Sequence, residues 1–514
     1  MLFRRDFLRN ASAAVLAPAV LLRAQTATAQ SGRTVRIGVV SPLNAFDPIR
    51  FSEAFIMRAV FPPLTRITTR TGDPLSGWEP YAGTPTQKLG WQASTPYIDI
   101  TPTPTRVWHQ GQSHTLDDIM RGIERARQRL RAIDIVDNIK KLTIESGACR
   151  VYLHNPDTRP YKEIFARSWT SPLSTDLEAA LVNPPDQIPK FSRTLGPYVF
   201  ADPCIPGDVI TLKANPAWKQ RGAGVDVFSI RRYPTVRLLT AAFSAHAADL
   251  VFLPSDRIQA DESVTPAEFQ ALATVEKDIT SAVSYVAIES GTGVTADPRV
   301  RQAFRAGIDP VKVAEVAYGT HAEPTSDILP AGFLKERPSA RRWYDPGRAL
   351  QLLAEAGRGD GFEGRLVVLQ SASDSERRAA ENIIDQLGAI RIRLTLEFTT
   401  FQVNRPEPST RSTFFLVRTP LVQTPGQAFA SFTTRAPQNI ARFSSAEYDK
   451  TVQEITSAGE GWEKLVQQAR AILDREAVLV PLLQPRNYLF ARRGLRASFA
   501  LDGTPGDLAD VVWG

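Results

Sequence analysis

The residues best suited to bind a ligand lie at the ends of expected strands, and they do not form a catalytic set. Arg418 offers a planar fork for a carboxylate or phosphate-like group, or is a solvated arginine at a strand end. Gln423 can donate and accept hydrogen bonds inside a pocket, or face solvent. Gln370 and Ser371 end another expected strand, and ligands gather at such ends in open α/β sheets.

Three further candidates belong to the same set. Asn44 and Phe46 follow the first expected strand, and Phe46 either stacks on a ligand or fills the core. Tyr285, in an apolar strand, is either a core residue or a ligand contact. These seven residues are our candidate ligand contacts.

Metal and catalytic motifs are missing from the sequence. The five histidines are scattered, with no His-Glu-x-x-His motif and no Cys/His ligand spacing. There is no Gly-x-Ser-x-Gly motif for a nucleophilic serine. We predict no catalytic residue, no metal site and no cofactor. Cys149 and Cys204 form a disulfide only if their Cα atoms come within bonding range, which the sequence leaves open.

The first 29 residues have the order of a removable export signal. Arg4 and Arg5 precede an apolar run from Ala11 to Leu22, and Ala27-Thr-Ala29 provides a small-x-small cleavage site. The paired arginines followed by Asp-Phe-Leu resemble the twin-arginine export consensus. A membrane anchor is the alternative, but the run is shorter than the roughly 20 residues that a bilayer requires. We expect a mature chain from about Gln30 in the periplasm.

Composition describes a globular protein. Of 514 residues, 43% are hydrophobic and 22% are charged. The formal net charge is +7, and Arg4, Arg5, Arg9 and Arg23 against Asp6 place +3 of it in the leader. The remaining excess of about +4 is spread out, whereas nucleic-acid binding favours a clustered basic face. We therefore expect no nucleic-acid partner.

Hydrophobic periodicity predicts alternating helices and strands. We expect strands near 34–40, 97–101, 141–145, 149–153, 196–200, 208–213, 249–253, 284–288, 365–370, 392–397, 413–417 and 477–483, and helices near 51–60, 115–132, 235–246, 300–307, 347–356, 375–388 and 462–476. The segment from 365 to 397 reads as a β-α-β unit, which implies a parallel sheet. The second half is thus an α/β lobe, and the first half is a mixed lobe rich in strands.

Several patterns, in order along the chain, resemble the family-5 extracellular solute-binding proteins of ABC importers, the dipeptide, oligopeptide and nickel-complex class. The matching segments are Phe46-Asp-Pro48, Tyr97-Ile-Asp-Ile, Trp108-His-Gln-Gly111, Leu116-Asp-Asp118, Gly196-Pro-Tyr198 with Asn215-Pro-x-Trp218, Asp297 to Phe304 with Ile308-Asp309, and Tyr344 to Leu350 with Leu353 to Gly357. Together they cover nearly the whole mature chain.

The resemblance implies an α/β fold of the two-lobed periplasmic binding protein kind, type II, with an extra subdomain in lobe I. The expected domains are a signal peptide at 1–29, lobe I at 30–58, 180–284 and 481–514, the extra subdomain at 59–179, and lobe II at 285–480. It also implies lobes that close on a ligand by hinge motion, and a closed form that docks on an inner-membrane permease. We expect a monomer.

The resemblance also bears on the ligand. Peptide binders of this family hold the free amino terminus with an aspartate after the third strand of the second lobe, where this chain has Leu421. No acidic residue occurs between Glu407 and Glu447. A buried ammonium without a counter-charge is costly, so the departure disfavours free peptides and favours an anionic ligand at Arg418.

The expected function is therefore capture of a small-molecule or peptide-like solute, with an anionic ligand as one expected class, and its delivery to an ABC importer. One alternative is a ligand-binding partner of a membrane sensor, because the docking surface looks the same from one sequence. Another alternative is a periplasmic enzyme, for which the sequence supplies no catalytic residues.

Overall fold

The computed structural model describes residues 33–514 except 41–42, 44–46, 50–53, 69–75, 131–133, 183–193, 202–208, 219–223, 255–256, 259–272, 335, 401–411, 420–423, 437, 458–461, 501–504 and 514. The expected signal peptide lies outside the described residues. Residues 33–514 form a single unit by their internal contacts. None of the described helices is both long and apolar enough to cross a bilayer.

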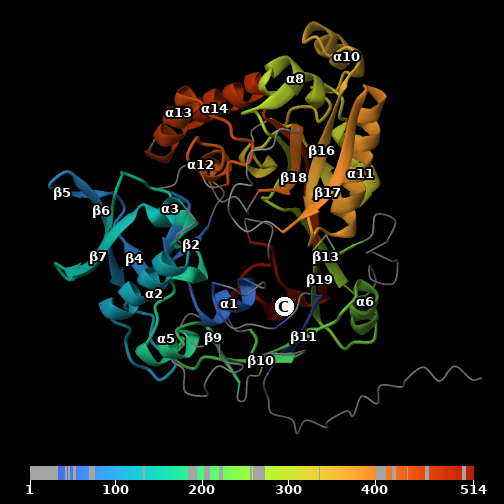
Figure 1. The fold of residues 1–514 in the computed structure, drawn as a ribbon. Coiled ribbons are helices and arrows are strands. Elements are labelled where there is room, and N and C mark those ends of the chain that lie inside the picture. The colour runs from blue at the N-terminus through green and yellow to red at the C-terminus, as the bar shows by residue number, and fades with distance from the viewer. Residues whose placement is uncertain are drawn as a thin grey trace, which may run out of the picture. The chain divides into compact units, whose positions relative to one another are not determined.

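A 12-stranded mixed sheet runs through the described part of this unit (Figure 1). Its order is β17 (Ile392–Thr399), β16 (Phe362–Leu369), β18 (Ser412–Arg418), β14 (Ser284–Ile288), β19 (Leu479–Arg492), β12 (Leu250–Leu253), β1 (Thr34–Val39), β11 (Val227–Arg232), β10 (Val209–Ala214) and β9 (Tyr198–Phe200), while β13 (Ala273–Ile279) and β15 (Ala322–Pro324) also pair with β19. The strands expected near 34, 284, 365, 392 and 413 are all present.

Strand β19 joins the two halves of this sheet. Its first residues pair with β14 and β15, and its later residues pair with β12 and β13. At the change of partners, Gln484 donates from Nε2 to the carbonyl of Thr280 at 2.8 Å and accepts from the amide of Ala331 at 3.0 Å. The expected strand ended at Leu483 because Gln484 and Pro485 interrupt the apolar run, but the ladder continues to Arg492. Strand pairing therefore overrides the local sequence signal.

The α/β half is built as the periodicity predicted. β16, α11 (Asp374–Ala389) and β17 form a β-α-β unit with parallel strands. Ser373 and Glu376 form a capping box at the start of α11. Alternate residues of β14, β16 and β18 enter two separate hydrophobic clusters: Phe414 packs among α8, α9, α10 and α11, whereas Phe415 packs among α12, α13 and α14. Helices thus cover both faces, as in other parallel sheets.

The helices of this half have the following bounds: α8 (Pro298–Ala306), α9 (Pro310–Tyr318), α10 (Pro346–Glu355), α12 (Pro425–Ala430), α13 (Ala446–Ser457) and α14 (Trp462–Glu476). Gly357 has φ of 69° and follows the end of α10, where it provides a left-handed cap. Helices α9, α12 and α13 were not predicted.

A separate small sheet forms a second structural part. It contains β4 (Gly83–Pro85), β6 (Thr95–Pro102), β8 (Ala148–Leu153) and β7 (Ile139–Glu145), and β5 (Gly90–Gln92) pairs with β6. Helix α2 (Leu116–Arg129) packs on this sheet, within the segment expected to be helical, and Thr115 with Asp118 forms a capping box at its start. Cys149 is buried in β8 and makes no disulfide with any described residue, while Cys204 lies outside the described residues.

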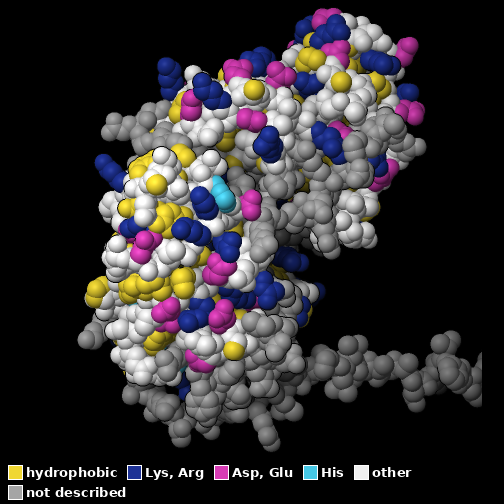
Figure 2. Space-filling model, turned by 60° about the vertical axis from the view of Figure 1, so that its left-hand side comes forward, with side chains coloured by type: hydrophobic (Ala, Val, Ile, Leu, Met, Phe, Trp, Pro, Cys, Tyr) yellow, Lys and Arg dark blue, Asp and Glu magenta, His cyan; other side chains and the backbone are white. Residues whose placement is uncertain are grey.

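The remaining helices and strands are α1 (Ala54–Val60), α3 (Asp134–Asp137), α4 (Pro160–Glu163), α5 (Thr175–Val182), α6 (Val236–Ser244), β2 (Thr65–Ile67), β3 (Trp78–Pro80), β20 (Leu495–Arg496) and β21 (Val512–Trp513). On the face shown in Figure 2, described Lys and Arg side chains are interspersed with Asp and Glu side chains. This mixture agrees with the small net charge of the mature chain.

Candidate functional site

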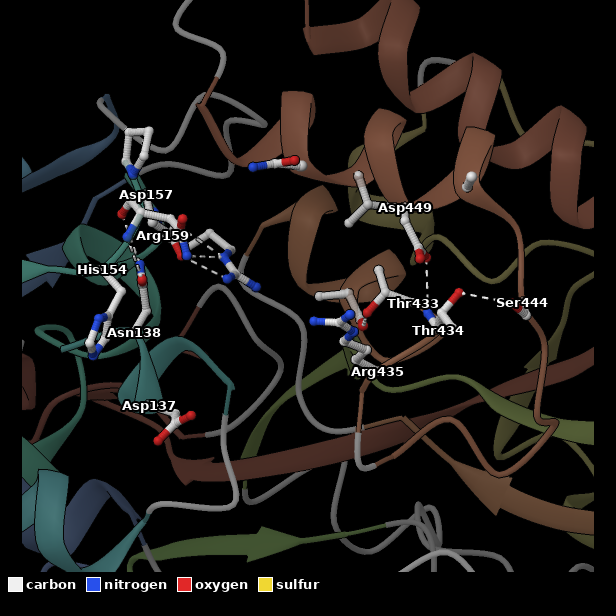
Figure 3. A pocket seen from close by; sticks show the side chains of 16 residues that line it. Asp137, Asn138, His154, Asp157, Arg159, Thr433, Thr434, Arg435, Ser444 and Asp449 are labelled. Atoms are coloured by element: carbon white, nitrogen blue, oxygen red, sulfur yellow. Dashed lines mark hydrogen bonds and ion pairs between the residues drawn. The ribbon is translucent and has the colours of Figure 1, made fainter. Parts of the chain in front are cut away.

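A cavity of about 790 Å³ lies between the part of the chain that contains the small sheet and the segment from the end of α12 to α13 (Figure 3). Its volume falls within the range of small-molecule sites. One wall consists of Asp137, Asn138, His154, Asn155, Pro156, Asp157 and Arg159, and the other consists of Ala430, Thr433, Thr434, Arg435, Ser444, Ala446, Asp449, Val452 and Gln453. The two walls come from segments that are far apart in the sequence.

The first wall is held by hydrogen bonds at the ends of β7 and β8. The amide of Asn155 donates to Oδ1 of Asn138 at 2.9 Å, and Nδ2 of Asn138 donates back to the carbonyl of Asn155 at 3.0 Å. The amide of His154 donates to the carbonyl of Asn138 at 2.8 Å. These bonds hold the end of β8 against the segment that joins α3 to β7.

A buried ion pair completes this wall. Both carboxylate oxygens of Asp157 accept from Nε of Arg159, at 3.1 and 3.0 Å, and Nη2 of Arg159 adds a contact of 2.7 Å. Both residues are buried. Such a paired charge shapes the wall without adding net charge to it.

The second wall is fixed by α12 and α13. The hydroxyl of Tyr448 donates to the carbonyl of Phe429 at 2.8 Å, which ties the two helices together. Oδ1 of Asp449 accepts from the amide of Thr434 at 2.9 Å, so this carboxylate stabilises the loop between the helices. Arg435 is exposed in the same loop and makes no ion pair with any described residue.

A second contact joins the same two parts of the molecule beside the cavity. The hydroxyl of Thr424, the N-cap residue of α12, donates to Oε1 of Glu163 at the end of α4. Glu163 is 4% exposed and Thr424 is 2% exposed. Because α4 packs in the cluster beneath the small sheet and α12 packs in the cluster beneath β18, this bond connects two separate cores.

The described candidates from the sequence lie away from this cavity. Gln370 and Ser371 are exposed after β16, and the carbonyl of Gln370 accepts from Arg377 at 3.1 Å. Tyr285 is buried in β14 and packs edge-on against Phe432, with ring centroids 5.5 Å apart. Burial raises the pKa of the Tyr285 phenol. Their roles as ligand contacts stay predictions.

Arg418 is the last residue of β18, so it lies at a strand end as expected, and its side chain is partly buried. Its Nη2 donates to the hydroxyl of Tyr318 at 3.0 Å and lies 3.5 Å from Oε1 of Glu376. A neighbouring carboxylate therefore offsets the charge of Arg418 in this structure. Its role as an anion anchor stays a prediction.

Asn44, Phe46 and Gln423 lie outside the described residues, as does Leu421. Among the described residues, no cluster of three or more His, Cys, Asp or Glu side chains is placed to hold a metal ion. Glu163, Arg159 and Arg435 were not among the residues predicted from the sequence. Their polar side chains beside strand and helix ends were the available signal, but such positions are common.

Known proteins share both sequence and fold with this chain. The sequence profile described as bacterial extracellular solute-binding proteins, family 5 Middle, matches residues 107–439. Heme-binding protein A of Haemophilus influenzae is 24% identical over 310 residues, which is 56% of this chain and 53% of that protein. Di/tripeptide-binding protein 2 of Pseudomonas aeruginosa is 27% identical over 272 residues, 51% of this chain and 49% of that protein. The chain thus matches about half the length of these curated relatives.

Solved structures extend the likeness to almost the whole chain. HbpA2 from Haemophilus parasuis superposes with a TM-score of 0.75 at 15% identity, covering 94% of this chain and 100% of that one. The periplasmic binding protein DppA from Helicobacter pylori, in complex with the peptide STSA, gives 0.70 at 16% identity, covering 94% and 99%. These matches confirm the expected two-lobed, type II periplasmic binding protein fold. Because the family profile covers more than half of the chain, this protein belongs to the family-5 bacterial extracellular solute-binding proteins, which are binding proteins rather than enzymes.

Proposed function

We propose that this protein captures a small, peptide-like solute in the periplasm and delivers it to the permease of an ABC importer. The match to the family-5 profile over residues 107–439 carries the proposal. The cavity of about 790 Å³ supports it, because its two walls come from separate parts of the chain and can move apart to admit a solute. The named peptide-binding relatives favour a peptide-like ligand.

The lobe boundaries expected from the sequence are part of this proposal. A lobe II of 285–480 begins within β14 and ends within β19, the two strands at which the halves of the large sheet meet. The bonds of Gln484 to Thr280 and Ala331 lie beside both crossings. We propose that closure pivots at these crossings, and that the protein acts as a monomer.

Ligand capture is tested with the purified mature chain. A thermal-shift screen would compare dipeptides, tripeptides, organic acids, sugars and metal chelates at equal concentrations. A ligand that binds the folded state raises the melting temperature, by mass action. We expect stabilisation by members of the peptide set, followed by a measured dissociation constant for each hit. A lack of stabilisation by every peptide at millimolar concentration would contradict the peptide class.

Export is tested separately with the full chain. Replacing Arg4 and Arg5 together by lysine should block transport through a twin-arginine pathway and leave the precursor in the cytoplasm. Cell fractionation with an antibody against the mature chain measures this. Unchanged periplasmic amounts of the double variant would show that the leader uses a different route.

A further inference from the structure

Five charged side chains form a group in the α/β half, between α8, α14 and the chain that connects β15 to α10 (Figure 1). Nη2 of Arg342 lies 3.1 Å from each carboxylate oxygen of Asp474. Nη2 of Arg470 donates to Oδ2 of Asp327. The fifth member is Arg305 on α8, and none of the five lines the cavity described above. The group therefore contains three arginines and only two carboxylates, and both carboxylates are already paired.

Arg305 is the arginine without a carboxylate partner. It is 6% exposed, and its side chain makes no hydrogen bond or ion pair with the described residues. Its guanidinium carbon instead lies 4.0 Å from the ring centroid of Trp343. Burial lowers the pKa of Arg305 to about 10, although the charge of Asp474 opposes this shift. A buried cation without a directly bonded counter-charge is costly, so this position favours an added anion.

Buried N–H donors close to Arg305 also lack acceptors. The indole Nε1 of Trp343 and the Nε atoms of Arg342 and Arg470 have no hydrogen-bond partner among the described residues. The guanidinium carbon of Arg342 lies 4.6 Å from the ring centroid of Trp343, so two arginines border this indole. Because buried donors in folded proteins are nearly always satisfied, these donors require an acceptor that the described part of the chain does not supply.

We propose that Arg305 and Trp343 form a binding site for a small inorganic anion of the chloride type. The anion supplies the missing negative charge and accepts hydrogen bonds from the guanidinium of Arg305 and the indole N–H of Trp343. A water molecule satisfies a donor but does not neutralise the charge. Arg342 and Trp343 are partly exposed, so an ion from the solvent can reach the group. The bound ion stabilises this half of the chain, and this role is independent of solute capture at the cavity.

Chloride binding is measured directly on the mature chain by chloride NMR, because the resonance of free chloride broadens when the ion exchanges with a protein site. The wild type should broaden the line, and bromide should reverse the broadening by competition, whereas the bulky gluconate anion should not. Arg305→Gln should abolish this bromide-sensitive broadening. Trp343→Phe keeps an aromatic ring but removes the N–H donor, and it should weaken chloride binding about tenfold.

The matched control is Arg358→Gln. Arg358 is exposed beyond the end of α10, and its side chain makes no hydrogen bond or ion pair with the described residues. If surface arginines cause the broadening, this variant should reduce it as much as Arg305→Gln does. We expect Arg358→Gln to behave as the wild type.

Thermal unfolding provides a second measurement. At equal ionic strength, the wild type should melt about 1–3 °C higher in potassium chloride than in potassium gluconate, because an ion that binds only the folded state stabilises it by mass action. Arg305→Gln should melt at the same temperature in both salts, while Arg358→Gln should keep the wild-type difference.

The outcomes decide the assignment without touching the proposed function, which concerns a different site. Anion effects that disappear in Arg305→Gln, weaken in Trp343→Phe and persist in Arg358→Gln support the anion site. Equal broadening by the wild type and Arg305→Gln, or a wild-type melting temperature that is the same in chloride and gluconate, overturns it. Should Arg305→Gln fail to fold, Trp343→Phe decides: unchanged chloride affinity in that variant also overturns the assignment.

Discussion

The bond between Thr424 and Glu163 should contribute measurably to the stability of the folded chain. Thr424→Val keeps the shape of the side chain but removes its hydroxyl. Two interactions are then lost: the hydroxyl no longer accepts from the amide of Gln427 at the start of α12, and it no longer donates to Glu163. The variant therefore loses both a helix cap and a charge-assisted hydrogen bond.

The magnitude follows from these two losses. An N-cap hydroxyl contributes about 1 kcal/mol, and a hydrogen bond to a charged group contributes about 1.5–3 kcal/mol. We therefore expect Thr424→Val to lower the free energy of unfolding by about 2.5–4 kcal/mol. Because both side chains are buried and water cannot readily replace the lost donor, the loss of unfolding free energy should lie in the upper part of this total range.

The matched control is Thr235→Val. Thr235 caps α6 by accepting from the amide of Leu238 at 3.2 Å, and its hydroxyl contacts no carboxylate of the described residues. Removing that hydroxyl should cost only the cap, about 1 kcal/mol. The difference between the two variants then isolates the contribution of the Glu163 contact.

Urea unfolding of the mature chain, followed by tryptophan fluorescence, measures both variants. A double-mutant cycle with Glu163→Gln gives the coupling between the two side chains directly. We expect a coupling of about 1.5–3 kcal/mol, the contribution of a hydrogen bond to a charged group. Equal destabilisation by Thr424→Val and Thr235→Val, with a coupling below about 0.5 kcal/mol, would refute the reasoning.

Three other predictions concern the small-sheet part. Burial lowers the pKa of the His114 imidazole and outweighs the effect of its bonds to two backbone carbonyls. The contribution of His114 to stability is therefore present above pH of about 6.5 and is lost as pH falls through the lowered pKa. His114→Gln should reduce the change in melting temperature between pH 7.5 and 5, whereas replacing the exposed His246 by Gln should leave that change as it is. Gly122→Ala should lower stability by about 1–3 kcal/mol in urea unfolding, because the new Cβ would lie 2.1 Å from the carbonyl oxygen of Ser171; an increase in stability would contradict this close approach. Burial raises the pKa of the Cys149 thiol to about 12, so iodoacetamide at pH 8 should leave Cys149 unmodified in the reduced, folded chain, and peptide mapping that finds rapid labelling would contradict its burial.

Local features of the fold followed directly from the sequence. The start of α2 after Thr115, the end of α10 before Gly357 and the β-α-β unit around α11 all appear where residue types and spacing placed them. Each depends on hydrogen bonds or dihedral preferences within a few residues, so a short window contains the information. The order of family-like segments predicted the two-lobed fold as well.

Strands that are held by pairing with distant parts of the chain were harder to predict. β11 and β13 were not predicted, and β19 extends beyond the apolar run that marked it, because its later residues are held by pairing with β12 and β13. Pairing partners lie hundreds of residues away, and the sequence pattern of one strand does not identify them. Strand length in this sheet is therefore a tertiary property.

The candidate site also depends partly on local sequence and partly on tertiary structure, and here the difference is larger. The sequence by itself determined the residue types available, the family and the lack of a catalytic motif. Only the tertiary structure placed Glu376 beside Arg418, brought Glu163 to Thr424 across 261 positions, and set Arg435 on a wall opposite Asp137 and His154. The physical reason is that a charge acts through its neighbours in space, and packing of separate hydrophobic cores decides which neighbours it has.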